Sequence, residues 1–183
     1  GADATQALIG ELELDASLCI AGLNSPKQTV VSGTVSAVES IVAHCEQKQL
    51  RSQRLRVSHA FHSHLMDPML EKFRKIAQAV EYREPAIGLV SNLTGELAGE
   101  NVTSPDYWVQ HIRNAVLFAQ SIETAVGAGV DTFVEIGPDP ILCGLGMRIE
   151  KAGQCHWIPS LRKNETEWSA LVSAVIAFHS AGG

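Results

Sequence analysis

The chain has 183 residues, of which 45% are hydrophobic and 19% charged, and a formal net charge of −6. This length fits one domain or two small ones with a buried core. The negative charge and the absence of a basic run argue against a nucleic-acid surface. No apolar run approaches the roughly 18 residues that span a bilayer, and no signal peptide opens the chain. We therefore expect a cytoplasmic protein whose four cysteines are reduced.

The first 57 residues have the pattern of a small mixed subdomain. The predicted elements are a helix over 3–13, strands over 17–23 and 28–32, a helix from residue 36, and a strand over 53–57. Ser36 and Glu39 match a capping box, in which each side chain satisfies a free N–H at the start of a helix. This order of elements predicts a ferredoxin-like plait whose first strand is missing.

From residue 58 onward the pattern changes to alternating helices and strands, as in a parallel α/β sheet. Helices are predicted from residues 67, 104, 116, 141 and 164, and apolar strands, buried on both faces, over 87–90 and 132–136. Asp67-Pro68 and Ser104-Pro105 place proline in the first turn, and Asp67 is expected to cap its helix. Two apolar stripes are expected to be core: Met69, Phe73, Ile76 and Val80, and Trp168, Leu171, Val172, Val175 and Ile176.

Three histidines, His59, His62 and His64, lie in the loop before the helix at Asp67. A histidine held between a strand and a helix, yet open to a cleft, suits a general base. On spacing alone, a polar loop with incidental histidines fits equally well. A metal site also fits, because zinc sites often use three nitrogen ligands.

The segment His59-Ala60-Phe61-His62 and the residues after it resemble the acyltransferase domains of modular type I polyketide synthases. That family is related to malonyl-CoA:acyl-carrier-protein transacylase. Further matches occur in the expected order: Asn24-Ser25-Pro26, Val30-Val31-Ser32-Gly33, Ser91-Asn92-Leu93-Thr94-Gly95, Tyr107-Trp108-Val109 with His111, Glu135-Ile136-Gly137-Pro138-Asp139-Pro140, and Pro159-Ser160-Leu161. The resemblance covers essentially the whole chain.

The resemblance implies that His62 is the general base of a Ser–His pair that transfers malonyl from malonyl-CoA to the phosphopantetheine thiol of an acyl carrier protein. It assigns to His111 a main-chain carbonyl that orients this base. It implies substrate-binding roles for Phe61 and His59, because a Phe at this position accompanies malonyl units in the family. A phenyl ring there leaves no room for a methyl branch. No permanently bound cofactor, metal or membrane is implied, and a neighbouring ketosynthase domain is an expected partner.

The family's nucleophilic serine lies in a Gly-His-Ser-x-Gly sequence, which does not occur here. We therefore expect an α/β chain that is the C-terminal portion of an acyltransferase, inactive without the missing N-terminal part. The expected divisions are an incomplete ferredoxin-like small subdomain over 1–57, the C-terminal part of the α/β hydrolase-like large subdomain over 58–158, and a linker with a helix over 159–183. Two alternatives stay open: a non-catalytic docking remnant of an acyltransferase, and a metal-binding module built on the histidine cluster.

Overall fold

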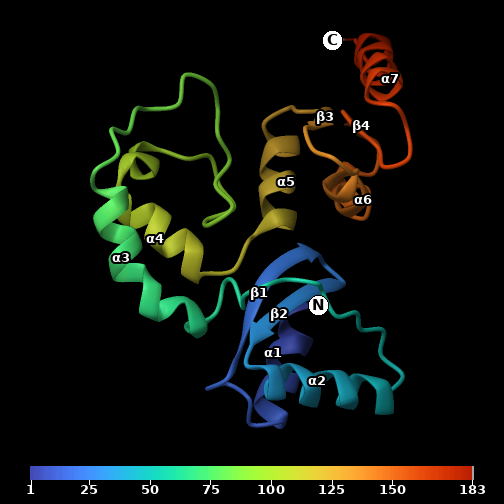
Figure 1. Ribbon diagram of the computed structural model, residues 1–183. Helices are drawn as coiled ribbons and strands as arrows, with labels where there is room; N and C mark the ends of the chain where they lie inside the picture. Colours follow the sequence, from blue (N-terminus) through green and yellow to red (C-terminus); the bar gives the residue numbers. More distant parts are fainter. Residues whose placement is uncertain (183) are drawn as a thin grey trace.

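An antiparallel hairpin with two helices packed against it forms the first part of the computed structural model, which describes residues 1–182 (Figure 1). Its elements are α1 (Ala2–Glu11), β1 (Leu18–Ser25), β2 (Gln28–Gly33) and α2 (Val35–Gln47). Ile9 of α1, Leu18 of β1 and Ile41 of α2 meet in one buried apolar cluster. Because each element contributes one apolar face to this cluster, its burial holds the hairpin and both helices together.

Two expectations for this part are wrong. The side chain that caps α2 is Thr34, whose hydroxyl accepts a hydrogen bond from the N–H of Ala37 at 3.3 Å, so Ser36 lies inside the helix. Residues 53–57 are exposed and form no strand among the described residues. Alternating side chains favour a strand, but a strand also needs a neighbouring strand to bond its backbone groups.

The remainder of the chain alternates short helices with one pair of parallel strands. Its elements are α3 (Asp67–Ala77), α4 (Pro105–Arg113), α5 (Phe118–Gly127), β3 (Thr132–Glu135), α6 (Ile141–Gly146), β4 (His156–Pro159) and α7 (Glu167–Ser180), with 3₁₀ turns at His64–Met66, Glu100–Thr103 and Glu150–Ala152. The predicted start of α4 is confirmed, because the hydroxyl of Ser104 accepts from the N–H of Asp106 and Pro105 occupies the first turn. The subdomain boundaries at residues 57 and 158 stay predictions.

Strands β3 and β4 pair in parallel from Thr132 opposite His156 to Glu135 opposite Pro159. The expectation of strands buried on both faces is wrong, because the described part of the sheet has only this pair here and Ile136 is exposed. The predicted strand over 87–90 is also wrong. It is reduced to a single bridge between Val90 and Leu97.

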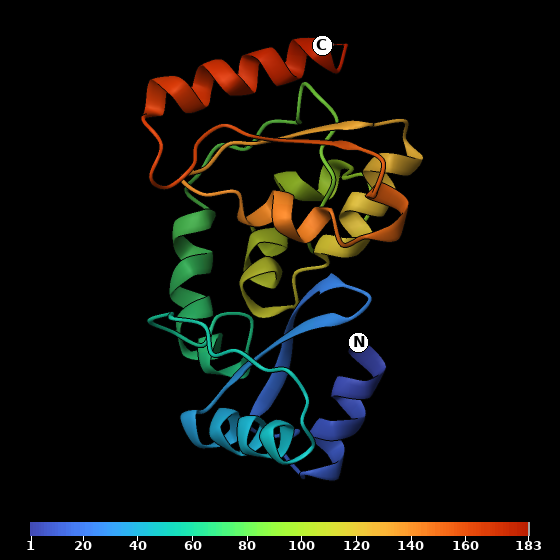
Figure 2. The same cartoon turned by 90° about the vertical axis from the view of Figure 1, so that its right-hand side faces the viewer.

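The two apolar stripes expected in the core are largely exposed. On α3, Ala77 is the buried residue and Ile76 is exposed. Val80, which lies beyond the end of the helix, is also exposed. Helix α7 lies across the edge of the molecule beside β4 (Figure 2), and Trp168 on it is 77% exposed. Helical periodicity identifies an apolar face, but it does not show which element covers that face.

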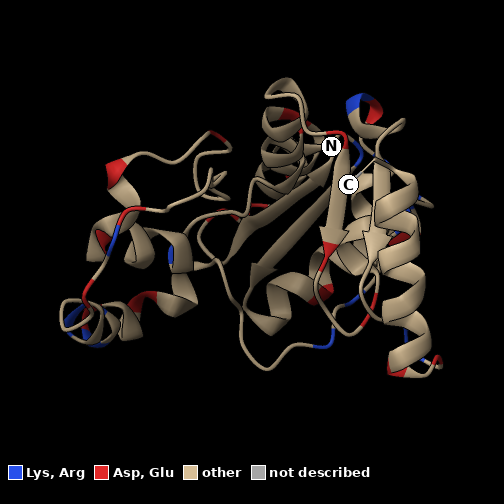
Figure 3. Cartoon of the chain, turned by 90° about the horizontal axis from the view of Figure 1, so that it is seen from above, with Lys and Arg blue, Asp and Glu red and all other residues tan. Residues whose placement is uncertain are grey.

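Charged residues of both signs are interspersed along the described elements rather than gathered by sign (Figure 3). The cysteines Cys19, Cys45, Cys143 and Cys155 are free thiols. Within residues 1–182, the helices are all too short or too polar to cross a lipid bilayer.

Candidate active site

The loop that carries His59, His62 and His64, called the histidine loop below, is fixed by the buried side chain of Ser63. Its hydroxyl donates to the carbonyl of Ala60 at 2.7 Å and accepts from the N–H of Leu65 at 3.2 Å, which starts the 3₁₀ turn that leads into α3. Ser63 is therefore committed to loop structure. The prediction that Asp67 caps this helix is wrong. Asp67 is the first residue of α3, and its carboxylate accepts a hydrogen bond from Arg113 instead of from the first turn.

His62 itself has a left-handed backbone conformation, with φ at 57°. A non-glycine residue in this region costs free energy and persists only where its surroundings hold it, which often occurs at functional sites. The Ser63 bonds on its C-terminal side supply that support. The backbone thus turns the half-buried imidazole of His62 toward the end of α4.

The ring of His62 meets a backbone carbonyl, but not the expected one. Its Nδ1 lies 2.7 Å from the carbonyl oxygen of Asn114. The assignment of this carbonyl to His111 is wrong, because Asn114 follows the last residue of α4 and its extended backbone (φ −92°, ψ 163°) directs its carbonyl away from the helix. A carbonyl can only accept, so Nδ1 carries the hydrogen and neutral His62 keeps a free electron pair on Nε2.

Asn114 is anchored from both sides. Its backbone N–H and its side-chain Nδ2 both donate to the carbonyl of Gln110 at 2.9 Å. Two residues later, the N–H of Val116 donates to the carbonyl of Ala21 at 3.0 Å. The carbonyl of Val116 accepts from the N–H of Leu23 at 2.9 Å. The segment that presents the carbonyl to His62 is therefore bonded to α4 on one side and to strand β1 on the other.

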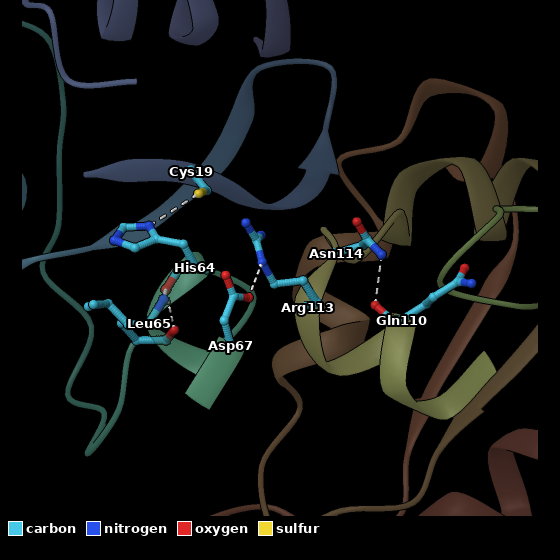
Figure 4. A network of polar contacts seen from close by, with 9 residues as sticks. Cys19, His64, Leu65, Asp67, Gln110, Arg113 and Asn114 are labelled. Carbon is cyan, nitrogen blue, oxygen red and sulfur yellow. Dashed lines mark hydrogen bonds and ion pairs between the residues drawn. The ribbon is translucent and has the colours of Figure 1, made fainter. Parts of the chain in front are cut away.

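Two side-chain contacts connect the histidine loop to the same neighbours (Figure 4). Nδ1 of His64 lies 3.8 Å from Sγ of Cys19 on β1. The carboxylate of Asp67 accepts from Nε of Arg113 at 2.7 Å, which joins the start of α3 to the end of α4. Both contacts bring residues from distant parts of the sequence to the neighbourhood of His62.

The side chain of His111 lies beside His62 rather than serving through its backbone. The two rings meet edge to face with centroids 6.2 Å apart, and the other side of His111 stacks on Tyr107 at 6.1 Å. The Tyr107 hydroxyl is in turn 2.7 Å from the hydroxyl of buried Ser91. Burial, and then the charge of His62, hold the pKa of His111 below its ordinary value of 6.5. A neutral His111 leaves His62 free to accept a proton without repulsion.

Phe61 and His59 lie on the outer side of the loop. Phe61 is 47% exposed, and its ring centroid is 5.8 Å from that of His59. Nδ1 of His59 is 2.9 Å from the hydroxyl of Ser58. The phenyl ring is thus not buried in the core, and the substrate-binding assignment of both residues stays a prediction.

The three loop histidines do not converge on one point. His62 contacts the Asn114 carbonyl, His64 contacts Cys19, and His59 contacts Ser58. Among residues 1–182, no group of three histidine, cysteine or acidic side chains is arranged to hold a metal ion. The metal-site hypothesis therefore receives no support from the geometry.

The Glu135 motif is structural. Its carboxylate accepts from the N–H groups of Leu142 and Cys143 at 2.9 and 2.7 Å, at the start of α6. Burial alone would raise the pKa of Glu135, but these N–H donors outweigh burial and hold the pKa below its usual range. Burial, together with Glu135, raises the pKa of Cys143 to about 11, so its thiol stays protonated at neutral pH.

Three residues near His62 were not identified from the sequence: Asn114, Asp67 as an ion-pair partner, and Arg113. Asn114 acts through its backbone, which leaves no side-chain pattern, although Asn directly after a helix is a common terminator. Asp67 and Arg113 are 46 positions apart. Their only local signal is an acid at one helix start and a base at another helix end.

The family to which the chain belongs follows from its similarity to known proteins. The family model described as acyl transferase domain matches residues 5–182. The chain belongs to the acyltransferase family. More narrowly, the chain belongs with the acyltransferase domains of type I polyketide synthases, and it resembles malonyl-CoA:acyl-carrier-protein transacylases.

Individual relatives support this placement. A phenolphthiocerol synthesis polyketide synthase type I of Mycobacterium marinum is 44% identical over 165 residues, which are 89% of this chain and 8% of that protein. The acyltransferase domain from the second module of the salinomycin polyketide synthase has a TM-score of 0.91 and 37% identity, with 98% of this chain and 42% of that chain covered. The malonyl-CoA-acyl carrier protein transacylase of Clostridium perfringens has a TM-score of 0.75 and 26% identity, with 90% and 51% covered.

These likenesses confirm the predicted α/β fold class, with ferredoxin-like and hydrolase-like parts. This chain spans only 42% of the length of the salinomycin acyltransferase domain.

Proposed function

We propose that this chain supplies the general base of an acyltransferase that moves a malonyl unit from malonyl-CoA to the phosphopantetheine thiol of an acyl carrier protein. The observation that carries the proposal is the 2.7 Å contact between Nδ1 of His62 and the carbonyl of Asn114. It fixes the tautomer and the orientation of the ring, as a base that must take a proton at Nε2 requires.

In the first half-reaction, a serine hydroxyl attacks the carbonyl carbon of the malonyl thioester. Nε2 of His62 takes the hydroxyl proton, the carbon–sulfur bond breaks, and CoA leaves as a thiol with the proton from the imidazolium. In the second half-reaction, His62 takes the proton of the phosphopantetheine thiol as its sulfur attacks the malonyl-serine ester. The ester bond breaks and the proton returns to the serine oxygen, so the base is regenerated.

The serine belongs to a portion of the acyltransferase outside these residues, because no Gly-His-Ser-x-Gly sequence occurs here. Serine is a weak nucleophile unless a base is within hydrogen-bond reach. His62 is half-buried and turned to the end of α4, and exposed Phe61 precedes it directly. This juxtaposition supports malonyl as the preferred acyl unit, because the ring would crowd a branch at the substrate C2.

The test uses malonyl-CoA labelled in the malonyl group. The chain alone should incorporate no label into protein, whereas the complete domain with its serine-bearing portion should form one labelled ester and pass the label to a carrier protein on addition. Stoichiometric labelling of the chain alone would contradict the assignment of the nucleophile. A complete domain that forms no ester from malonyl-CoA would contradict the proposed reaction.

A further inference from the structure

Two ion pairs join α3 to α4, and one of them lies directly beside the contact between His62 and Asn114. Asp67, in the first turn of α3, pairs with Arg113, in the last turn of α4, with 2.7 Å between Oδ1 and Nε. At the opposite ends of the same helices, Arg74 pairs with Asp106. An ion pair therefore joins the two helices at each end, but only the Asp67–Arg113 pair is near the histidine loop.

The covalent path from the Asp67–Arg113 pair to the site is short on both sides. Arg113 directly precedes Asn114, whose carbonyl meets His62. Asp67 follows His62 by five positions, through a turn that the buried hydroxyl of Ser63 fixes. A displacement of α3 relative to the end of α4 would therefore move the two partners of the catalytic hydrogen bond apart.

We propose that Asp67 and Arg113 are positioning residues that hold the His62 imidazole against the Asn114 carbonyl. The geometric part of this proposal concerns this chain alone, whereas its catalytic consequence rests on the proposed function. In this role the pair takes no part in the chemistry itself. It acts through the distance between Nδ1 and the carbonyl oxygen.

Exposure separates this role from a purely stabilising one. The side chain of Arg113 is 33% exposed and that of Asp67 is 54% exposed. A partly exposed pair of this kind contributes little to folding and is screened by salt. By contrast, misplacing a catalytic group by about 1 Å can lower a rate about 100-fold. Loss of the pair should therefore disturb His62 far more than it disturbs the stability of the fold.

The Arg74–Asp106 pair is a matched control. Its side chains have similar exposures, 34% and 62%. Asp106 lies in the first turn of α4 and Arg74 in the last turn of α3, so both pairs have the same favourable placement relative to the helix dipoles. Arg74 also lies 3.7 Å from Glu71 within its own helix, so Arg74→Gln removes at least as many charge contacts as Arg113→Gln. A change at His62 that occurs only in Arg113→Gln therefore reports the position of the pair.

The experiment is ¹H–¹⁵N correlation NMR of the histidine rings in this chain, with variants Arg113→Gln and Arg74→Gln. The unmodified chain should show His62 with its hydrogen on Nδ1. Arg113→Gln should give the averaged nitrogen shifts of a ring that exchanges between both tautomers, Arg113→Lys should restore the original pattern in part, and Arg74→Gln should change nothing. Asp67→Asn breaks the same pair from its other side and decides the question if Arg113→Gln does not fold. Unaltered His62 shifts in Arg113→Gln or Asp67→Asn, or equal changes in Arg74→Gln, would overturn the proposal.

An activity measurement in the complete domain keeps this inference separate from the proposed function. Arg113→Gln should lower kcat for malonyl transfer up to about 100-fold and leave KM for malonyl-CoA nearly unchanged, because only the base is displaced. If His62→Ala left the complete domain fully active, the proposed function would fail while the NMR result stood. If the NMR pattern did not change, the positioning role would fail while the proposed function stood.

Discussion

The imidazoles of His111 and His62 face each other edge to face, with ring centroids 6.2 Å apart. At this separation a charge on one ring disfavours a charge on the other. Burial against Tyr107 and Trp108 makes His111 the ring that stays neutral, and its pKa lies below 6.5. In the proposed reaction, the proton taken from the nucleophile therefore resides on His62, whose orientation the Asn114 carbonyl fixes.

Replacing His111 by phenylalanine should make the fold less sensitive to acid. The folded pKa of His111 is below the unfolded value, so the unfolded chain binds more protons near pH 6.5. The stabilising contribution is thus present above that pH and is lost as the pH falls through the folded pKa. Urea midpoints at about pH 7.5 and about pH 5.5 should differ less in His111→Phe than in the unmodified chain. Equal losses in the two proteins would contradict this account.

A complementary change is His62→Gln, which removes the charge that disfavours protonation of His111. NMR titration should then give a higher pKa for His111 than in the unmodified chain, because the effect of His62 is absent while burial stays. A pKa of His111 that did not rise would show that the two rings are not coupled.

Asn114 should tolerate loss of its side chain but not a change of its backbone. Asn114→Ala removes only the bond from Nδ2 to the carbonyl of Gln110, so the His62 tautomer should persist, with at most about 1 kcal/mol lost in stability. Asn114→Pro also removes the backbone N–H bond to Gln110 and disfavours the helical conformation of Arg113. It should release His62 into both tautomers. If Asn114→Ala had the effect expected of proline, the carbonyl would not be the orienting group.

Glu135→Gln should destabilise the fold by about 1 kcal/mol at neutral pH, since its charged oxygens bind two N–H groups at the start of α6. The pKa of Glu135 is depressed, so its contribution is present above the unfolded pKa near 4.5 and is lost as the pH falls through the folded pKa. The difference between the two proteins should accordingly vanish in acid. Exposed Glu84→Gln is the control, and it should leave stability unchanged at both pH values.

The features that could be predicted from sequence are those carried by side chains in a local motif. The loop that holds His62 before α3 and the Ser104-Pro105 helix start are of this kind, whereas the catalytic role of His62 stays a prediction. The strand over 53–57 could not be predicted correctly, because alternation is a local pattern whereas a strand requires a partner. The carbonyl of Asn114 escaped prediction because every residue has one.

The Asp67–Arg113 pair escaped prediction for a different reason. Its members belong to separate helices, and only the antiparallel packing of α3 and α4 brings them together. In the sequence, Asp67 before Pro68 resembles an N-cap. In the structure Asp67 is the first residue of α3, one position after the N-cap. Charged residues at helix ends are therefore ambiguous between capping and pairing until the neighbouring helix is known.

Phe61→Ser in the complete domain should relax the choice between malonyl-CoA and methylmalonyl-CoA. Removing the half-exposed ring opens space beside the substrate C2, but one methyl group is worth only ~1–3 kcal/mol of discrimination, so a clean switch is not expected. A competition assay measures the ratio of the two acyl-enzymes. An unchanged ratio in a folded and active variant would show that Phe61 does not contact the acyl unit.

The central claim is that His62 is the base, and the rate of acylation in the complete domain tests it most directly. His62→Ala should slow formation of the malonyl-serine ester by about 10²–10⁴-fold, the usual contribution of a general base. His59→Ala and His64→Ala, which remove neighbouring rings with contacts to Ser58 and Cys19, should slow it far less. A His62→Ala enzyme that acylates at the unmodified rate, or a larger loss in His64→Ala, would contradict the account.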